Sequence, residues 1–264
     1  MDLQLKGKTA FITGSTSGIG FATAKLLLEE GVKVIVNGRT TARVDTAVDR
    51  LESLVPNTAV EGIVADFSKK SAVTDVVEKI SNVDILINNV GIYTAQSFFE
   101  TTPEDWEKQL TVNLMSGVGL SKALLPTMLK ANWGRVVFIS SECATLVPAD
   151  MIAYSTTKAA MLALSRGLAQ LTSGTQVTVN TLIPGSTRTE GAEQFLADVA
   201  KKENKTKAVV EEEFFSNVRT SSLLQRFASV EEIANAIAFY VSPLSAATNG
   251  AAIKLEGGSM GGII

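Results

Sequence analysis

Short runs of apolar and β-branched residues alternate with longer segments of helical spacing along the whole of this 264-residue chain. The predicted strands are 9–13, 32–36, 59–65, 84–88, 136–140, 177–183 and 251–255. The predicted helices are 21–30, 41–54, 69–81, 104–130, 152–172 and 229–241. Strict alternation of strand and helix gives parallel strands with helices on both faces. We therefore predict an α/β fold, a doubly wound parallel sheet of about seven strands.

One long segment breaks this alternation. Residues 186–228 are polar and include the charged runs 201–203 and 211–213. A connection of this length in a compact domain is usually a lid or a binding loop, although a solvated helical insertion without a role fits equally well. We expect one domain over residues 1–264, with a substrate-loop insertion at about 186–228.

The chain contains no histidine and a single cysteine, Cys143. These counts exclude a Ser-His-Asp or Cys-His nucleophile, a histidine-ligated zinc and a disulfide within the chain. In an enzyme of this composition, a Tyr, Lys, Asp or Glu side chain or a cofactor must move protons. We expect no metal site.

Charge and hydropathy narrow the range of partners. The formal net charge is −3, and the basic stripe that is typical of nucleic-acid binders is absent. The N-terminus lacks the pattern of a signal peptide, and no run of about 18 apolar residues predicts a membrane span. We expect a cytoplasmic protein that binds neither nucleic acid nor membrane.

A glycine-rich turn, Thr13-Gly14-Ser15-Thr16-Ser17-Gly18-Ile19-Gly20, lies between the first predicted strand and the first helix. Glycines here allow a tight turn and a close approach of the backbone to a pyrophosphate, which the N–H groups of the helix N-terminus then bind. The spacing differs from the common GxGxxG pattern and lacks the Lys-Ser/Thr of a P-loop. An ordinary glycine-rich turn is the alternative, which the position between strand and helix disfavours.

The residues after the second strand bear on the choice of cofactor. Sites for NAD usually place an acidic residue there, on the ribose 2′-hydroxyl. This chain has Asn37-Gly38-Arg39-Thr40 instead, and the Arg39 guanidinium can pair with a 2′-phosphate. The sequence favours NADP(H) over NAD(H), although Arg39 could simply face solvent at the end of a strand.

Tyr154 and Lys158 are four residues apart on a predicted helix and so share one face. A free tyrosine has a pKa of about 10, and a neighbouring ammonium group lowers that value. Ser141 ends the fifth predicted strand, where its hydroxyl can bond a substrate carbonyl. A Tyr-x3-Lys pair alone is weak evidence, because most such pairs are surface neighbours.

The ordered set of motifs resembles the short-chain dehydrogenase/reductase family. The motifs are Thr-Gly-x3-Gly-Ile-Gly at 13–20, Asn-Asn-x-Gly at 88–91, Asn113, Ser141, Tyr-x3-Lys at 154–158 and Pro-Gly at 184–185. The resemblance runs from about residue 5 to 260. It implies a single Rossmann-type domain, hydride transfer between NAD(P) and a small carbonyl or alcohol, and a homo-oligomer, either a tetramer or a dimer.

The resemblance also implies roles for four catalytic candidates. Tyr154 matches the general acid/base, and Lys158 matches the residue that lowers its pKa and holds the nicotinamide ribose. Ser141 matches the donor to the substrate oxygen. Asn113 matches the family's helix-kinking asparagine, which positions a water in a proton relay through Lys158.

Further positions match the family's cofactor contacts, in addition to Arg39, Tyr154 and Lys158. They are Gly14, Ser17, Ile19, Gly20, Asp66, Phe67, Asn88, Gly91, Pro184, Gly185, Thr187 and Thr189. Three positions depart from the family pattern. Val90 stands where alanine is usual, Thr187 stands where valine or isoleucine is usual, and Ser17 stands where many NADP-preferring members carry a basic residue, so the NADP(H) prediction rests mainly on Arg39. None of these departures touches the four catalytic candidates.

Three functions are consistent with these residues. The leading one is an NADP-dependent carbonyl reductase or alcohol dehydrogenase. A 3-oxoacyl-carrier-protein reductase is a narrower variant, but Arg188 and Lys201-Lys202 form no clear basic cluster for an acidic carrier protein. A regulatory protein that binds NADP without catalysis is the alternative from another class, and the presence of both Tyr154 and Lys158 disfavours it.

Overall fold

The computed structural model describes residues 1–80 and 82–262. In this part of the chain, seven parallel strands form one sheet in the order β3-β2-β1-β4-β5-β6-β7. The strands are β1 Thr9–Ile12, β2 Lys33–Gly38, β3 Val60–Val64, β4 Ile85–Asn88, β5 Gly134–Ile139, β6 Val177–Pro184 and β7 Ala252–Leu255. The doubly wound parallel sheet predicted from the strand-helix alternation is confirmed.

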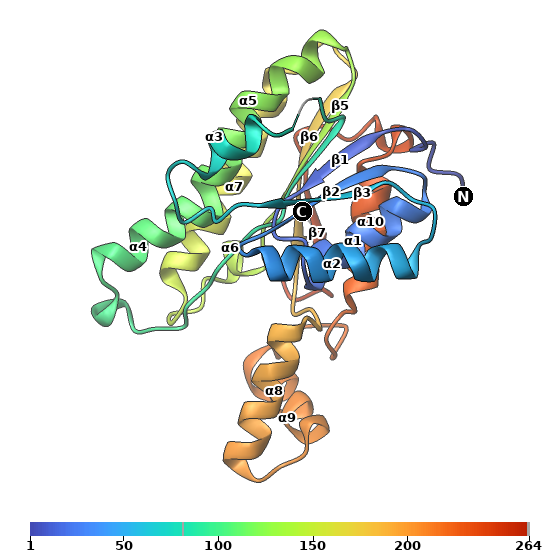
Figure 1. Ribbon diagram of the computed structural model, residues 1–264. Helices are drawn as coiled ribbons and strands as arrows, with labels where there is room; N and C mark the ends of the chain where they lie inside the picture. The colour runs from blue at the N-terminus through green and yellow to red at the C-terminus, as the bar shows by residue number, and fades with distance from the viewer. Residues whose placement is uncertain (81, 263–264) are drawn as a thin grey trace.

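Helices cover both faces of the sheet (Figure 1). One layer holds α1 Gly18–Glu29, α2 Thr41–Leu54 and α10 Val230–Tyr240, and the other holds α3 Ala72–Val77, α5 Ser116–Lys130 and α7 Ile152–Gln170. The shorter helices are α4 Pro103–Gln109, α6 Cys143–Leu146, α8 Glu190–Glu203 and α9 Lys207–Glu213.

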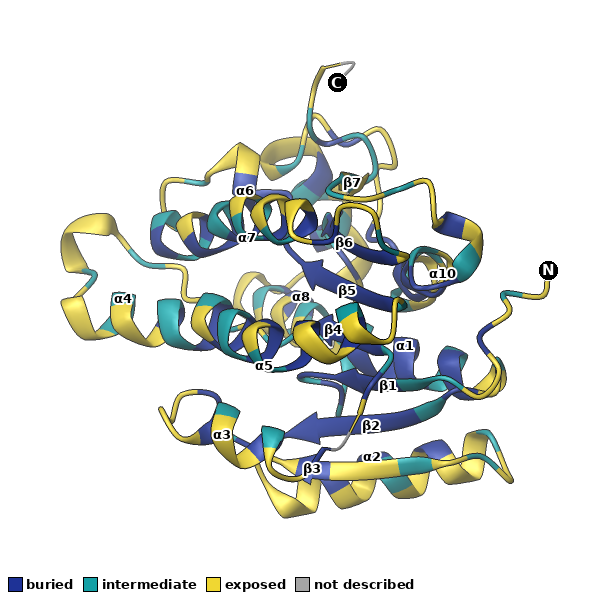
Figure 2. Cartoon of the chain, turned by 90° about the horizontal axis from the view of Figure 1, so that it is seen from above, coloured by how far each residue is buried: buried dark blue, intermediate teal, exposed yellow. Residues whose placement is uncertain are grey.

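The five inner strands β2, β1, β4, β5 and β6 are buried on both faces, whereas the edge strands β3 and β7 and the outer sides of the helices are largely exposed (Figure 2). Successive residues of β1 pack on opposite faces of the sheet. Ala10 and Ile12 pack in the core beneath α1 and α10, whereas Phe11 packs in the core beneath α5 and α7. Full burial of a side chain such as Ile12 or Phe11 contributes about 1.5–3 kcal/mol. The two apolar cores therefore fix the strands that carry the candidate site.

Two predicted helices differ from the observed ones. The segment predicted as a helix over 69–81 forms only the short α3, and its last residue lies outside the described residues. The zone predicted as one helix over 104–130 is divided into α4, a π-helical turn at Leu110–Met115 and α5. A π-helical turn inserts an extra residue per turn and often marks a functional site.

The segment 186–228 is helical rather than irregular. Helices α8 and α9, followed by a π-helical turn at Phe214–Val218, project away from the sheet (Figure 1). Phe214, Phe215 and Phe227 pack against one another as a small separate core, with ring centroids 5.1 to 5.3 Å apart. The two ends of the segment 186–228 are joined by backbone hydrogen bonds. The Ala228 N–H donates to the Ser186 carbonyl at 3.0 Å, and the Arg188 N–H donates to the Ala228 carbonyl at 2.8 Å.

Parallel strands bring their carboxyl ends to one edge of the sheet. The chain leaves β1 toward β2 and β3 and then returns to β4 on the other side of β1, which makes a topological switch point where ligands bind in such folds. Within residues 1–80 and 82–262, no helix is both long and apolar enough to cross a membrane.

Candidate active site

The glycine-rich turn after β1 adopts a conformation that requires glycine. Gly14 and Gly18 have φ values of +61° and +58°, in the left-handed region that side chains disfavour. A Cβ on Gly20 would lie 2.6 Å from Asn89 Nδ2 and 2.7 Å from the Gly14 carbonyl oxygen. The turn is therefore tight enough for the backbone to approach a ligand closely.

Polar side chains from neighbouring strand ends hold this turn in place. The Gly14 N–H donates to Asn37 Oδ1 at 3.0 Å. Asn89 Nδ2 donates to the Thr13 and Gly14 carbonyl oxygens, each at 2.9 Å. Both asparagines lie in segments that the sequence singled out, 37–40 and 88–91, but their role in holding the glycine turn was not predicted.

The N-terminus of α1 is left without a capping side chain. Ser17 occupies the cap position but makes no side-chain hydrogen bond to the helix, and the first turn contains no acidic residue. Helix N-termini carry free N–H donors and a positive partial charge. The first turn, with Ile19 and Gly20, therefore offers N–H donors of the kind that bind a pyrophosphate.

Arg39 and Asp66 follow the neighbouring strands β2 and β3. Arg39 is exposed, whereas Phe67, which follows Asp66, is buried. Burial tends to raise the pKa of Asp66, but the Ser68 N–H, 3.1 Å away, and the Arg39 charge outweigh it and hold the pKa below its ordinary value. Asp66 is thus a carboxylate next to an exposed guanidinium, an arrangement that suits an adenosine with a phosphate on its ribose.

Asn88 is the last residue of β4, at the switch point between β1 and β4, and Gly91 follows three residues later. The Asn88 amide is buried against α5, where a Cβ on Gly117 would lie 3.4 Å from its Cγ, and neither amide atom has a hydrogen-bond partner in the described structure. Gly91 adjoins Lys158, since a Cβ on Gly91 would lie 3.2 Å from Lys158 Nζ. Gly91 therefore leaves room for the lysine.

Asn113 lies inside the π-helical turn between α4 and α5. Its side chain is buried and is fixed by three hydrogen bonds, from the Ile92 N–H at 2.8 Å, to the Ile92 carbonyl at 2.9 Å and to Thr157 Oγ1 at 3.0 Å. These contacts join the segment after β4 to helix α7. The π-helical turn interrupts the α-helical hydrogen bonding at Asn113, the position at which the family resemblance implies a kink.

Ser141 and Tyr154 lie together beyond the end of β5. Burial raises the pKa of Tyr154 above its ordinary value, and a hydrogen bond with Ser141 opposes that effect. The Tyr93 ring packs edge-on at 6.0 Å between centroids. A half-buried neutral phenol beside a serine hydroxyl can donate a proton to an oxygen that both groups reach.

Lys158 is buried one helical turn after Tyr154. Its Nζ donates to the Ile139 carbonyl at 2.8 Å and lies 5.6 Å from the centroid of the Tyr154 ring. Burial lowers the pKa of Lys158 to about 8. We expected the lysine to hold the tyrosine pKa down, but burial of the phenol is the stronger effect here and the tyrosine pKa lies above its ordinary value.

The turn after β6 completes this edge of the site. Thr187 Oγ1 donates to the Gly185 carbonyl at 2.9 Å and so fixes the turn that Pro184 begins. Thr189 Oγ1 accepts from the Ala192 N–H at 3.2 Å and caps α8. Thr189 also adjoins the glycine turn, since a Cβ on Gly18 would lie 3.4 Å from its Cγ2.

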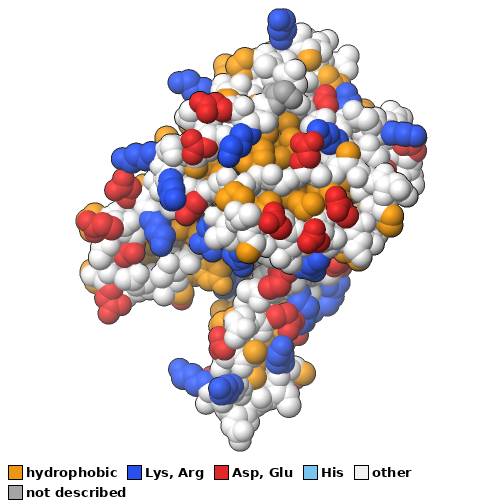
Figure 3. Space-filling model, in the orientation of Figure 1, with side chains coloured by type: hydrophobic (Ala, Val, Ile, Leu, Met, Phe, Trp, Pro, Cys, Tyr) orange, Lys and Arg blue, Asp and Glu red, His pale blue; other side chains and the backbone are white. Residues whose placement is uncertain are grey.

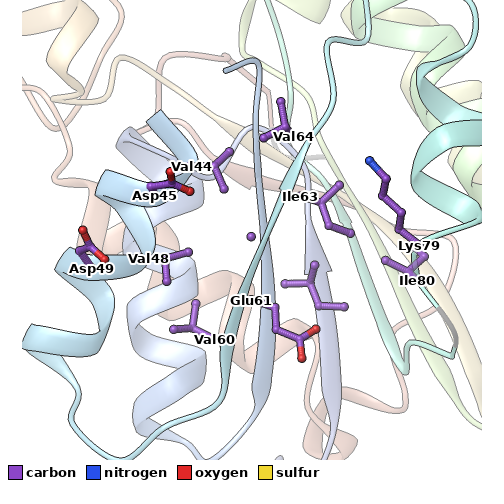
Figure 4. A pocket seen from close by; sticks show the side chains of 12 residues that line it. Val44, Asp45, Val48, Asp49, Val60, Glu61, Ile63, Val64, Lys79 and Ile80 are labelled. Atoms are coloured by element: carbon purple, nitrogen blue, oxygen red, sulfur yellow. The ribbon is translucent and has the colours of Figure 1, made fainter. Parts of the chain in front are cut away.

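A surface groove lies elsewhere and is lined by none of these residues. It measures about 540 Å³ and runs between α2 and the outer edge of β3 (Figure 4). Its floor is apolar, with Val44, Val48 and Ile63, and charged side chains surround it (Figure 3). Among the described residues, no group of three Cys, Asp or Glu side chains is placed to hold a metal ion.

Comparisons with known proteins agree with this geometry. The family model described as short chain dehydrogenase matches residues 8–200. The chain is 42% identical over 258 residues to the Bacillus subtilis oxidoreductase YvaG, and the match covers 98% of each chain.

Two solved structures are similar over nearly the whole chain. The L-sorbose reductase from Gluconobacter frateurii, in complex with NADPH and L-sorbose, has a TM-score of 0.93 at 28% identity, with 100% of both chains covered. A 3-oxoacyl (acyl-carrier-protein) reductase from Agrobacterium tumefaciens with NADP bound has a TM-score of 0.85 at 32% identity, covering 96% of this chain and 95% of that one.

The glycine turn and the Tyr154 ring beside the buried Lys158 thus occur in one chain with a full-length match to known oxidoreductases. We conclude that this protein belongs to the short-chain dehydrogenase/reductase family.

Proposed function

We propose that the protein is an NADP(H)-dependent oxidoreductase that reduces a small carbonyl compound to an alcohol, or performs the reverse reaction. The observation that carries this proposal is the pairing of Tyr154 with the buried Lys158 one helical turn later, whose Nζ lies 5.6 Å from the centroid of the tyrosine ring. The similarity to a reductase that holds NADPH and a sugar supports it.

The residues for the cofactor form a continuous track along the carboxyl edge. The α1 N-terminus and the glycine turn offer N–H donors for the pyrophosphate, and Asp66 adjoins the adenosine end. Arg39 is exposed and can pair with the 2′-phosphate, which favours NADP(H) over NAD(H). Pro184, Gly185 and Thr187 form the turn at the nicotinamide end.

The chemistry divides between cofactor and protein. Bound NADPH supplies the hydride, as in other nicotinamide enzymes. Ser141 donates a hydrogen bond to the substrate carbonyl oxygen and orients it, and Tyr154 donates its phenolic proton to the same oxygen. Lys158 provides positive charge behind the phenol as that proton leaves. Asn113 positions α7 through Thr157, and the relay water that the family resemblance implies is part of this proposal.

A 3-oxoacyl-carrier-protein reductase remains a narrower candidate because one similar structure carries that name. Ion pairs in the segment 186–228 disfavour it. Arg188 pairs with Glu193 at 2.7 Å and with Glu211, and Lys205 pairs with Glu203 at 2.8 Å and Glu213 at 2.7 Å. Bases that are already neutralised in this way attract an acidic carrier protein weakly.

The experiment is a substrate screen on the full chain. Ketones, quinones and 3-oxoacyl thioesters are offered with NADPH or NADH, and consumption of reduced nicotinamide is followed by absorbance. We expect turnover with NADPH on small ketones. If NADPH binds but no carbonyl is reduced, the regulatory NADP-binding alternative is favoured and the proposal is wrong. Size measurement in solution tests the expected tetramer or dimer.

A further inference from the structure

Glu142 is a buried carboxylate directly after the catalytic candidate Ser141. Its side chain is 4% exposed. One carboxylate oxygen, Oε1, accepts hydrogen bonds from Arg219 Nε at 2.8 Å and from Ser186 Oγ at 3.3 Å. The other, Oε2, is buried without a partner in the described structure. A carboxylate is costly to bury unless it is paired. The ion pair with Arg219 therefore offsets the cost of burying the Glu142 carboxylate.

Arg219 comes from the end of the segment 186–228, and only part of its guanidinium is used. Its side chain is 14% exposed, and Nε is engaged by Glu142. The contacts of its other nitrogens in the described structure are weak: Nη1 meets the Val218 carbonyl at 3.5 Å, and Nη2 meets Cys143 Sγ at 4.0 Å. Guanidinium N–H groups are strong donors and seek acceptors. The guanidinium also lies 5.8 Å from the centroid of the Phe214 ring. Its two outer nitrogens therefore make no strong hydrogen bond in the described structure.

That wall adjoins the reacting centre. Cys143 accepts the Arg219 contact, and its own N–H donates to Ser141 Oγ at 3.2 Å. The electrostatic influence of Cys143 and Glu142 also reaches the Tyr154 phenol. Arg219 is thus one side chain away from the two groups that contact the substrate oxygen.

We propose that Arg219, held by Glu142, recognises a second, uncharged oxygen on the substrate, so that the enzyme prefers hydroxylated ketones to plain ketones and to oxo acids. This inference rests on the proposed reductase function and deepens it. The guanidinium and the carboxylate cancel in charge, and the unpartnered Oε2 of Glu142 repels an anion. Such a pair donates N–H groups to a hydroxyl or ether oxygen without attracting a carboxylate.

The strength of this preference follows from hydrogen-bond selectivity. A site built to hydrogen-bond a substrate hydroxyl rejects an analogue that lacks it, because its buried donors are then left unpaired. A hydrogen bond from a charged donor contributes enough for a preference of about 10- to 100-fold.

The test uses six-carbon substrates that differ only in the group beside the carbonyl. They are 1-hydroxy-2-hexanone, 2-hexanone and 2-oxohexanoate, each reduced with NADPH, and kcat/KM is measured for each. For the wild-type chain we expect the hydroxyketone to exceed the plain ketone by about 10- to 100-fold and to exceed the oxo acid. A wild-type preference for the oxo acid or the plain ketone would overturn the proposal.

Variants assign the preference to the pair. The double variant Glu142→Gln/Arg219→Met removes both charges, avoids an unpaired buried carboxylate and should lower the hydroxyketone-to-ketone ratio about tenfold or more. Glu142→Gln alone leaves a net positive guanidinium and should raise the ratio for 2-oxohexanoate over 1-hydroxy-2-hexanone. A merely structural role would not change substrate preference in this direction.

The control is Arg226→Met, which breaks a surface pair with Glu232 at 2.8 Å in the same segment and should leave the ratios unchanged. NADPH binding by fluorescence confirms that each variant is folded. If the wild type reduces ketones but the double variant keeps the wild-type ratio, this inference fails and the proposed function stands. If the wild type reduces none of the carbonyl compounds, both fail.

Discussion

Lys158 Nζ lies 5.6 Å from the centroid of the Tyr154 ring and donates its hydrogen bond to the Ile139 carbonyl, not to the phenol. In the proposed mechanism the lysine therefore acts on the tyrosine through space, as a charge near the ring. Because it is buried, its pKa is lowered to about 8, close enough to neutral pH for that charge to be lost under mildly alkaline conditions.

We expect carbonyl reduction to fall as the pH rises through about 8. Below that value Lys158 is an ammonium group that favours proton loss from Tyr154, and above it the charge disappears. The chain has no histidine, so an inflection in kcat near neutral pH cannot come from imidazole. The measurement is a kcat profile from mildly acidic to alkaline pH for wild type and Lys158→Arg. The arginine variant keeps a charge throughout, so an unchanged inflection in that variant would contradict the assignment.

The depressed pKa of Lys158 also predicts a pH effect on stability. Between the folded value of about 8 and the unfolded value of about 10.4, the unfolded chain binds more protons than the folded chain. The contribution of Lys158 to the free energy of unfolding therefore rises with pH in that window. Thermal unfolding of wild type and Lys158→Met should show this slope in the wild type only, and parallel curves would show that Lys158 is not responsible.

Replacement of Tyr154 by Phe should abolish most of the turnover and spare the cofactor. Removal of a general acid typically lowers kcat by about 100- to 10,000-fold, whereas the ring keeps its edge-on contact with Tyr93. Steady-state kinetics and NADPH fluorescence titration separate the two effects. Turnover at the wild-type level in Tyr154→Phe would refute the proposed mechanism.

Arg39→Ala should reduce the preference for NADPH over NADH by about 10- to 100-fold, because it removes a charged donor to the 2′-phosphate. The matched control is Lys33→Ala at the opposite end of the same strand, where Lys33 pairs with Glu61 at 2.7 Å. The measured quantity is the ratio of kcat/KM for the two cofactors. Equal ratios in both variants would show that Arg39 does not select the cofactor.

Gly20→Ala should prevent cofactor binding and destabilise the fold by about 1–3 kcal/mol, since the added Cβ would collide with backbone atoms of the glycine turn. Gly167→Ala is the control, because nothing lies within 4 Å of its Cβ position in α7. A helix-interior Gly→Ala change of that kind should stabilise by about 0.5–1 kcal/mol. Denaturant unfolding and NADPH titration distinguish the two variants.

The sequence predicted the inner strands well because they are buried on both faces and so read as apolar runs, whereas the edge strands β3 and β7 are largely exposed and contain charged residues such as Glu61 and Lys254. It predicted helix ends less well. The division of residues 104–130 at Leu110–Met115 depends on Asn113 bonding to Ile92, a contact between segments far apart in the chain. Helical spacing alone does not reveal such a contact.

The candidate site shows the same division between local and long-range information. Motif spacing found Ser141, Tyr154 and Lys158, but it predicted a lowered tyrosine pKa, whereas the structure shows that burial raises it. Arg219 was missed altogether. It lies 77 positions from Glu142 in the chain, and only the folded segment 186–228 brings the two together.

The backbone bonds that join Ser186 and Arg188 to Ala228 have an evolutionary consequence. They bring the two ends of the helical segment together at one point beside the sheet, so the segment is attached to the rest of the domain at a single place. The length and sequence of a segment attached in this way can change between relatives without disturbing the strands beneath it. New substrates can then be acquired while the machinery for hydride transfer is inherited intact.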